Sequence, residues 1–183
     1  ERPDITLKMP ISKDKFKKKL KNPDSKLNET ASEQYENILD KQADICMQIF
    51  SKPICVLSGA AGTGKTTAVS AVLSLLKEYQ TKSVLLAPTG RAAKVLSSYA
   101  GQQAYTIHKH IYRQKSVGGD GFGQFSIAPN KDKETLFVVD EVSLIGIDAG
   151  QQQSTASFGT GNLLEDLISF VRSGAECKVI LIG

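Results

Sequence analysis

The chain has 183 residues, of which 40% are hydrophobic, and it carries a formal net charge of +4. This length corresponds to about one domain, and so much apolar material excludes a chain that is disordered throughout. No apolar run approaches the ~18 residues that a membrane-spanning helix needs, and no signal peptide is visible. The three cysteines lie far apart and form no C-x-x-C pair, which favours a reducing, cytoplasmic location.

Residues 1–31 are predicted to form a basic N-terminal extension. They are rich in Lys and Asn, contain three prolines, and gather positive charge in a run from Lys13 to Lys21. One short helix is predicted over residues 13–20. Two interpretations of the lysine run stay open: the solvated face of a helix, or an arm that binds DNA. Residues 32–183 are predicted to form a single α/β domain.

Helices and strands are predicted to alternate after residue 31. Apolar residues at helical spacing predict helices over residues 32–50, 66–79, 91–100 and 162–173, and another helix is expected to begin near Thr106. Short apolar runs predict buried strands over residues 54–57, 83–87, 136–139 and 178–182. Such runs without polar alternation are typical of a parallel sheet that has helices on both faces. The glycine-rich residues 116–133 are expected to form a loop or hairpin insertion, and residues 150–161 a mobile loop.

The last predicted helix has recognisable ends. Asn162 and Glu165 resemble a capping box at its start, and Gly174 is expected to end it.

The strongest motif is GAAGTGKT over residues 59–66, which matches the phosphate-binding P-loop pattern G-x-x-x-x-G-K-[ST]. A predicted strand precedes it and an amphipathic helix follows it, as the motif requires. Glycines let backbone N–H groups turn toward phosphate oxygens, and the helix N-terminus adds a favourable dipole. The nucleotide-binding residues are expected to be Gly59, Ala60, Ala61, Gly62, Thr63, Gly64, Lys65, Thr66 and Thr67. Lys65 is expected to act on the β and γ phosphates, and Thr66 to bind Mg²⁺.

An acidic pair, Asp140-Glu141, follows the apolar strand over residues 136–139. The carboxyl ends of parallel strands meet at one edge of a sheet, so this pair is expected beside the P-loop. Asp140 is expected to hold Mg²⁺ and Glu141 to activate the water that attacks the γ-phosphate. The adjacent Asp and Glu favour a hydrolase, which activates a water molecule, over a kinase, which activates a hydroxyl group of its substrate.

Five segments, GAAGTGKTT, LLAPTGRAAKVLS, TIH, VVDEVSLI and KVILIG, occur in this order. Together they resemble motifs I, Ia, Ib, II and the start of III of superfamily 1 helicases, most closely the RecD-like, Dda-type branch. The resemblance covers about residues 40 to 183. It implies a RecA-like P-loop NTPase fold, ATP and Mg²⁺ as cofactors, and single-stranded DNA as a partner.

The resemblance also implies roles for residues outside the P-loop. The expected DNA contacts are Pro88, Thr89, Gly90, Arg91, Thr106 and His108. Gln42 is expected to bind the adenine edge, although Lys41 stands where the family has Glu. The alternatives are a plain strand-to-helix turn around Gly90, a surface glutamine at position 42, and an ordinary partly buried histidine at position 108.

The sequence also departs from the family pattern. Val142 replaces the usual alanine after Asp-Glu. The sequence given stops at Gly183, before the Asp and the γ-phosphate-sensing Gln that the family has next after the KVILIG segment. We therefore expect a piece of a longer polypeptide whose second RecA-like domain supplies arginines for catalysis. Alone, the chain is expected to bind nucleotide but hydrolyse it weakly. Two other classes stay open: another P-loop enzyme, of AAA or nucleotide kinase type, and a non-catalytic ATP-gated binding module.

Overall fold

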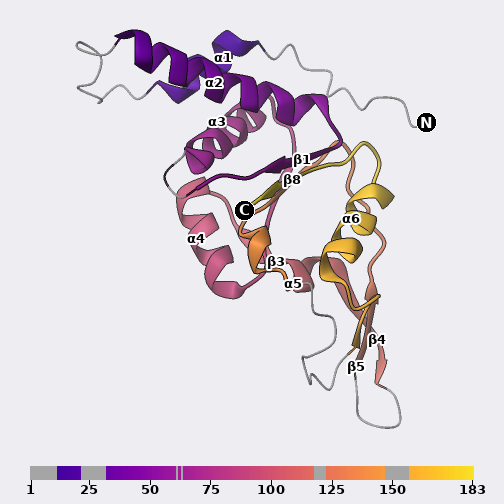
Figure 1. Ribbon diagram of the computed structural model, residues 1–183. Helices are drawn as coiled ribbons and strands as arrows, with labels where there is room; N and C mark the ends of the chain where they lie inside the picture. Colours follow the sequence, from indigo (N-terminus) through magenta and orange to yellow (C-terminus); the bar gives the residue numbers. More distant parts are fainter. Residues whose placement is uncertain (1–11, 22–31, 61, 63, 118–122, 147–156) are drawn as a thin grey trace.

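A parallel β-sheet forms the centre of the domain in a computed structural model that describes residues 12–21, 32–60, 62, 64–117, 123–146 and 157–183 (Figure 1). Its strands are β1 (Ile54–Leu57), β2 (Ser83–Ala87), β3 (Ala104–Thr106), β6 (Leu136–Val139) and β8 (Lys178–Ile182). Within the described residues these five strands lie in the order β1-β8-β6-β2-β3. Every neighbouring pair is parallel. The predicted α/β fold with a parallel P-loop sheet is confirmed.

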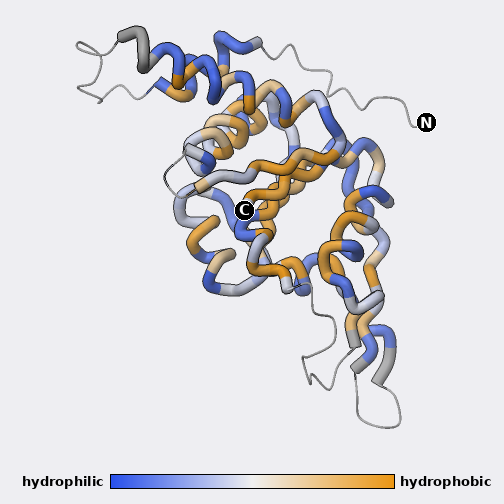
Figure 2. The backbone as a smooth tube through the Cα atoms, in the orientation of Figure 1, coloured by the Kyte–Doolittle hydropathy of each residue, from blue (hydrophilic) through white to orange (hydrophobic). Residues whose placement is uncertain are grey.

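Helices cover both faces of this sheet. One face carries α1 (Lys13–Leu20), α2 (Ser32–Ser51), α3 (Lys65–Glu78) and α4 (Gly90–Ala100), and the other carries α5 (Ile107–Ile111) and α6 (Leu163–Ser173). Side chains alternate between the two cores because a strand has a period of two: Leu85 and Ala87 face one core, whereas Val84 and Leu86 face the other. Figure 2 shows the hydrophobic residues concentrated along the central strands. Among the described helices, none combines the length and apolar character that crossing a bilayer requires.

The edge strands differ from their prediction. Residues 54–57 were expected to be buried, but Ile54 is 37% and Val56 is 68% exposed. The reason is that β1 is an edge strand that pairs only with β8 among the strands described, so the face that bears these two side chains is incompletely covered. β3, at the opposite edge, is not predicted from the sequence, because a strand of three residues gives no periodic signal.

Helix α1 packs into the domain. Phe16 is fully buried and its ring lies 5.7 Å from that of Phe50. The lysines of α1 face acidic side chains of α2 and α3: Lys13 lies 2.8 Å from Asp44, and Lys19 lies 2.9 Å from Glu78. These ion pairs favour the solvated-face interpretation of the lysine run over a DNA-binding arm.

The insertion before β6 contains a hairpin that extends away from the sheet (Figure 1). Its strands β4 (Tyr112–Val117) and β5 (Gly123–Ile127) are antiparallel, and β7 (Ser157–Phe158) pairs with β5. The hairpin alternative is thus confirmed, although β4 starts before the predicted residue 116. Most of the predicted mobile loop, residues 150–156, lies outside the described residues.

The ends of α6 agree with the sequence only in part. The Asn162 side chain accepts a hydrogen bond of 3.1 Å from the backbone N–H of Glu165, as predicted for the start of this helix. Gly174 does follow the last turn, but its φ of −76° is not the left-handed conformation of a glycine C-cap.

A buried carboxylate joins this helix to the hairpin. Asp166 of α6 is fully buried. It accepts hydrogen bonds from the Tyr112 hydroxyl at 2.5 Å, the Thr160 hydroxyl at 2.8 Å and the Thr160 backbone N–H at 3.1 Å. Burial and this bond to Asp166 together raise the pKa of Tyr112. A buried charge needs such partners, so the cluster fixes α6 against β4.

Replacing Asp166 with alanine should lower the free energy of unfolding by about 3 kcal/mol, because three donors would lose their acceptor. Urea unfolding followed by circular dichroism measures this change. The comparison is Asp132→Ala, which removes a partly buried carboxylate bonded to Lys82, the residue directly before β2; this change should cost less. Equal stability of Asp166→Ala and wild type would show that the cluster does not hold the hairpin.

Candidate nucleotide site and nucleic-acid groove

Three strands bring the predicted nucleotide-binding residues to one edge of the sheet. β1 leads into the P-loop and β6 leads into Asp140, while β8 lies between them. The backbone N–H of Gly183, after β8, donates to the Leu57 carbonyl at 3.1 Å. The P-loop and Asp140 are therefore two strand spacings apart, about 10 Å. A phosphate chain with a hydrated cation fits such a gap.

The described part of the P-loop has the backbone that glycines permit. Gly62 and Gly64 have φ values of +80° and +85°, which glycine adopts far more readily than other residues. The Lys65 ammonium donates to the carbonyls of Gly59 and Ala60, so this side chain folds back over the loop. Thr66 is exposed in the first turn of α3. Ala61 and Thr63 lie outside the described residues.

Gln42 lies next to the P-loop although it is far from it in sequence. It sits on α2, and its side-chain amide occupies the space that a β-carbon on Gly64 would need. A side chain at position 64 is therefore disfavoured twice, by the positive φ and by Gln42. The structure thus brings Gln42 to the predicted nucleotide-binding residues.

Asp140 and Glu141 have well-defined geometry. Asp140 Oδ2 accepts a hydrogen bond of 2.7 Å from the Tyr99 hydroxyl, and its Oδ1 accepts one of 2.9 Å from the backbone N–H of Glu141. Each oxygen keeps a lone pair for a further ligand. Glu141 is exposed and has φ +53° and ψ 41°, a left-handed conformation that costs roughly 1–2 kcal/mol outside glycine. Strain of this kind is found at functional positions.

The donor atoms at this edge suit Mg²⁺. The Thr66 hydroxyl and the Asp140 carboxylate are oxygen ligands, which Mg²⁺ prefers. Within the described ranges, no group of three or more His, Cys, Asp or Glu could hold a metal ion by itself. A cation here would need further oxygens, as a nucleotide phosphate chain provides.

A groove of about 470 Å³ lies beside the start of α4. It is lined by Gly90, Ala93, Lys94, Gln103, Ala104, Tyr105, Thr106 and Lys109. The groove joins the two segments in which DNA contacts are predicted, because Gly90 and Thr106 both line it. Lys94, Tyr105 and Lys109 also line the groove and were not predicted from the sequence. The signal for Lys94 was its position four residues after Gly90, on the same side of the helix.

The two predicted threonines cap the helices beside this groove. Thr89 Oγ1 accepts from the backbone N–H of Ala92 at 3.2 Å, and Thr106 Oγ1 accepts from that of Lys109 at 3.3 Å. Each hydroxyl keeps its proton for donation to a phosphate. Arg91 is exposed, and its guanidinium has no hydrogen bond or ion pair with any residue the structure describes. Pro88 is half-buried at the end of β2.

His108 does not line the groove. Its ring lies 5.2 Å from Phe158 and 5.6 Å from Tyr112, on the side of the hairpin. Partial burial against these rings lowers its pKa. These contacts favour the interpretation of an ordinary histidine that packs on aromatic rings.

Comparisons with known proteins give the family of the chain. The AAA domain family matches residues 37–157. The ATP-dependent RecD2 DNA helicase of Deinococcus radiodurans is 32% identical over 148 residues, covering 81% of this chain and 18% of its own length. The ATP-dependent DNA helicase dda of Enterobacteria phage T4 is 43% identical over 95 residues, covering 48% of this chain and 20% of its own length.

An uncharacterized protein of Methanocaldococcus jannaschii is 30% identical over 142 residues, covering 72% of this chain and 12% of its own length. The chain thus spans less than a quarter of each of these relatives. The chain belongs to the AAA domain family, with the RecD-like, Dda-type helicases of superfamily 1 as its relatives.

Proposed function

We propose that this chain is the ATP-driven motor domain of a DNA helicase, which binds MgATP and single-stranded DNA and couples hydrolysis to translocation in its full-length protein. The observation that carries the proposal is the arrangement along one sheet edge. The P-loop and Asp140 occupy the ends of β1 and β6, and the groove lies at the ends of β2 and β3. Two relatives are described as ATP-dependent DNA helicases.

Each residue of the nucleotide site has a proposed role. The backbone of the P-loop holds the phosphates, Lys65 adds a positive charge to the β and γ phosphates, and Gln42 binds the adenine edge. Thr66 and Asp140 hold Mg²⁺, which when bound neutralises charge on the phosphates. Glu141 orients and deprotonates the attacking water. A second RecA-like domain of the same polypeptide would close over the site and complete it.

The groove has the chemistry of a single-stranded nucleic-acid site. Lys94, Lys109 and nearby Arg91 offer positive charge to a phosphate backbone, and Tyr105, which is 41% exposed, offers a ring for a base to stack on. The first turn of α4 adds backbone N–H groups and the positive end of its dipole.

The experiment that tests the proposal is ATP turnover by the full-length protein with and without oligo(dT). A helicase motor should hydrolyse ATP faster when oligo(dT) is present. Turnover that is unchanged by the oligonucleotide, or absent, would favour another P-loop enzyme or a non-catalytic binding module.

Arg91→Ala should weaken binding to oligo(dT) and leave nucleotide affinity unchanged. Losing one phosphate contact should lower the slope of log affinity against log salt by about 0.7 for a single strand. Fluorescence anisotropy at several salt concentrations measures both quantities. The control replaces Lys15, Lys17, Lys18 and Lys19 of α1 together, and its slope should stay at the wild-type value because α1 faces acidic side chains. An unchanged slope in Arg91→Ala with a reduced slope in the control would move the DNA site to α1.

A further inference from the structure

We infer that Tyr99 is a positioning residue for the proposed magnesium ligand Asp140, and that it links this ligand to the helix that borders the DNA groove. The inference rests on the proposed function, because it gives a role to one more side chain of the same nucleotide site.

The contact itself joins two separate elements. Tyr99 lies in the last turn of α4, and its hydroxyl donates to Asp140 Oδ2 at 2.7 Å. Helical side chains point back toward the start of their helix, so the Tyr99 ring reaches from the end of α4 toward the carboxyl end of β6. With the backbone N–H of Glu141 on Oδ1, both Asp140 oxygens are held. A held carboxylate loses less freedom when it binds a cation, as hydrogen-bonded metal ligands do.

The same helix borders the groove at its other end. Gly90, Ala93 and Lys94 of α4 line the groove. Helix α4 has 11 residues and so spans roughly 16 Å. A strand of DNA that moves the first turns of α4 would move Tyr99 as well, because a helix of this length is stiff.

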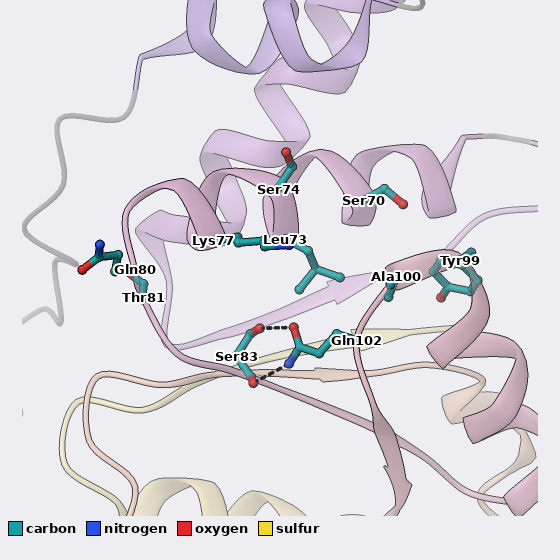
Figure 3. A pocket seen from close by; sticks show the side chains of 11 residues that line it. Ser70, Leu73, Ser74, Lys77, Gln80, Thr81, Ser83, Tyr99, Ala100 and Gln102 are labelled. Atoms are coloured by element: carbon teal, nitrogen blue, oxygen red, sulfur yellow. Dashed lines mark hydrogen bonds between the residues drawn. The ribbon is translucent and has the colours of Figure 1, made fainter.

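An open pocket lies beside the contact between Tyr99 and Asp140. A volume of about 580 Å³ lies between α3 and α4, and Figure 3 shows Ser70, Leu73, Ser74 and Lys77 of α3 on one side and Tyr99 at one end. Beside this open pocket, α3 and α4 share one hydrophobic core, and Tyr99 packs against that core. The hydrogen bond from Tyr99 to Asp140 adds to this packing a specific polar connection from α4 to the nucleotide site.

The experiment measures binding rather than turnover. Affinity for a fluorescent ATP analogue is titrated against Mg²⁺ in the chain, with and without oligo(dT). In Tyr99→Phe, the Mg²⁺ concentration for half-maximal effect should rise roughly tenfold, the size expected when a hydrogen bond to a metal ligand is lost. Affinity in the presence of a chelator should stay unchanged. Oligo(dT) should shift the Mg²⁺ dependence of the wild type and leave that of Tyr99→Phe unmoved.

The matched control is Tyr112→Phe, which removes the same kind of tyrosine–aspartate bond at Asp166, on the opposite face of the sheet. It should lower the melting temperature without changing the Mg²⁺ dependence. Tyr99→Leu, which also lacks the hydroxyl, should repeat the shift of Tyr99→Phe. If nucleotide affinity in a folded Tyr99→Phe variant depended on Mg²⁺ as in the wild type, the role of Tyr99 would be wrong, but the proposed nucleotide site would stand. A wild-type chain whose nucleotide affinity ignores Mg²⁺ would overturn the proposed nucleotide site as well.

Discussion

Replacing Lys65 with alanine should lower the affinity for MgATP at least ~100-fold while the thermal stability stays unchanged. Among the residues that the structure describes, the ammonium donates to the carbonyls of Gly59 and Ala60, and Lys65 is not part of the apolar core. Its loss removes charge-assisted hydrogen bonds to phosphate, each worth roughly 1.5–3 kcal/mol, and 1.4 kcal/mol corresponds to tenfold in affinity. Isothermal titration calorimetry with MgATP measures the change.

The control for this experiment is Lys77→Ala. Lys77 is an exposed lysine in the last turn of the same helix, α3. The substitution removes the same charge from the same helix but leaves the P-loop intact, so the affinity for MgATP should stay at the wild-type value. Wild-type affinity in Lys65→Ala would mean that residues 59–66 do not hold the phosphates.

Glu141→Gln should cut ATP turnover in the full-length protein by about 100-fold or more and keep the affinity for ATP, since a general base contributes an effect of this size. Glutamine has nearly the same shape and cannot take a proton from water. Asp140 keeps both of its hydrogen bonds in this variant, because the donor at position 141 is the backbone N–H. Steady-state turnover with saturating oligo(dT), alongside nucleotide binding, separates the two effects.

Glu134→Gln is the matched control for this change. Glu134 is exposed and also has a positive φ, of 45°, but it precedes β6 instead of following it. Its replacement reproduces the loss of a carboxylate at a left-handed position and should leave turnover within a factor of about two. If Glu141→Gln retained turnover near that of wild type, another group would have to activate the water.

The sequence predicts the helices and strands of this domain better than it predicts their positions in the sheet. The main helices and the four longer strands of the central sheet follow from apolar spacing, because the period of the pattern is a local property. The position of a strand within a sheet is not local. A continuous apolar run such as residues 54–57 looks the same at the centre and at the edge, and so the exposure of Val56 could not be foreseen.

The same reasoning applies to the candidate site. The P-loop is one contiguous sequence motif, and the Asp140-Glu141 pair is another. Each could therefore be recognised from a short stretch of sequence. Gln42 could be placed near the P-loop only through a family resemblance, and Tyr99 carried no signal at all, since its partner Asp140 is 41 residues away. Contacts of this kind depend on how α4 packs on the sheet, which no local pattern records.

The packing of helix α1 indicates that the smallest stable unit of this protein includes residues before α2. The family match starts at residue 37, yet Phe16 and Leu20 fill the surface formed by α2 and α3. A truncation at residue 32 would remove α1, and with it the ring of Phe16 that lies against Phe50. The autonomous folding unit therefore extends upstream of the region that the AAA domain family shares.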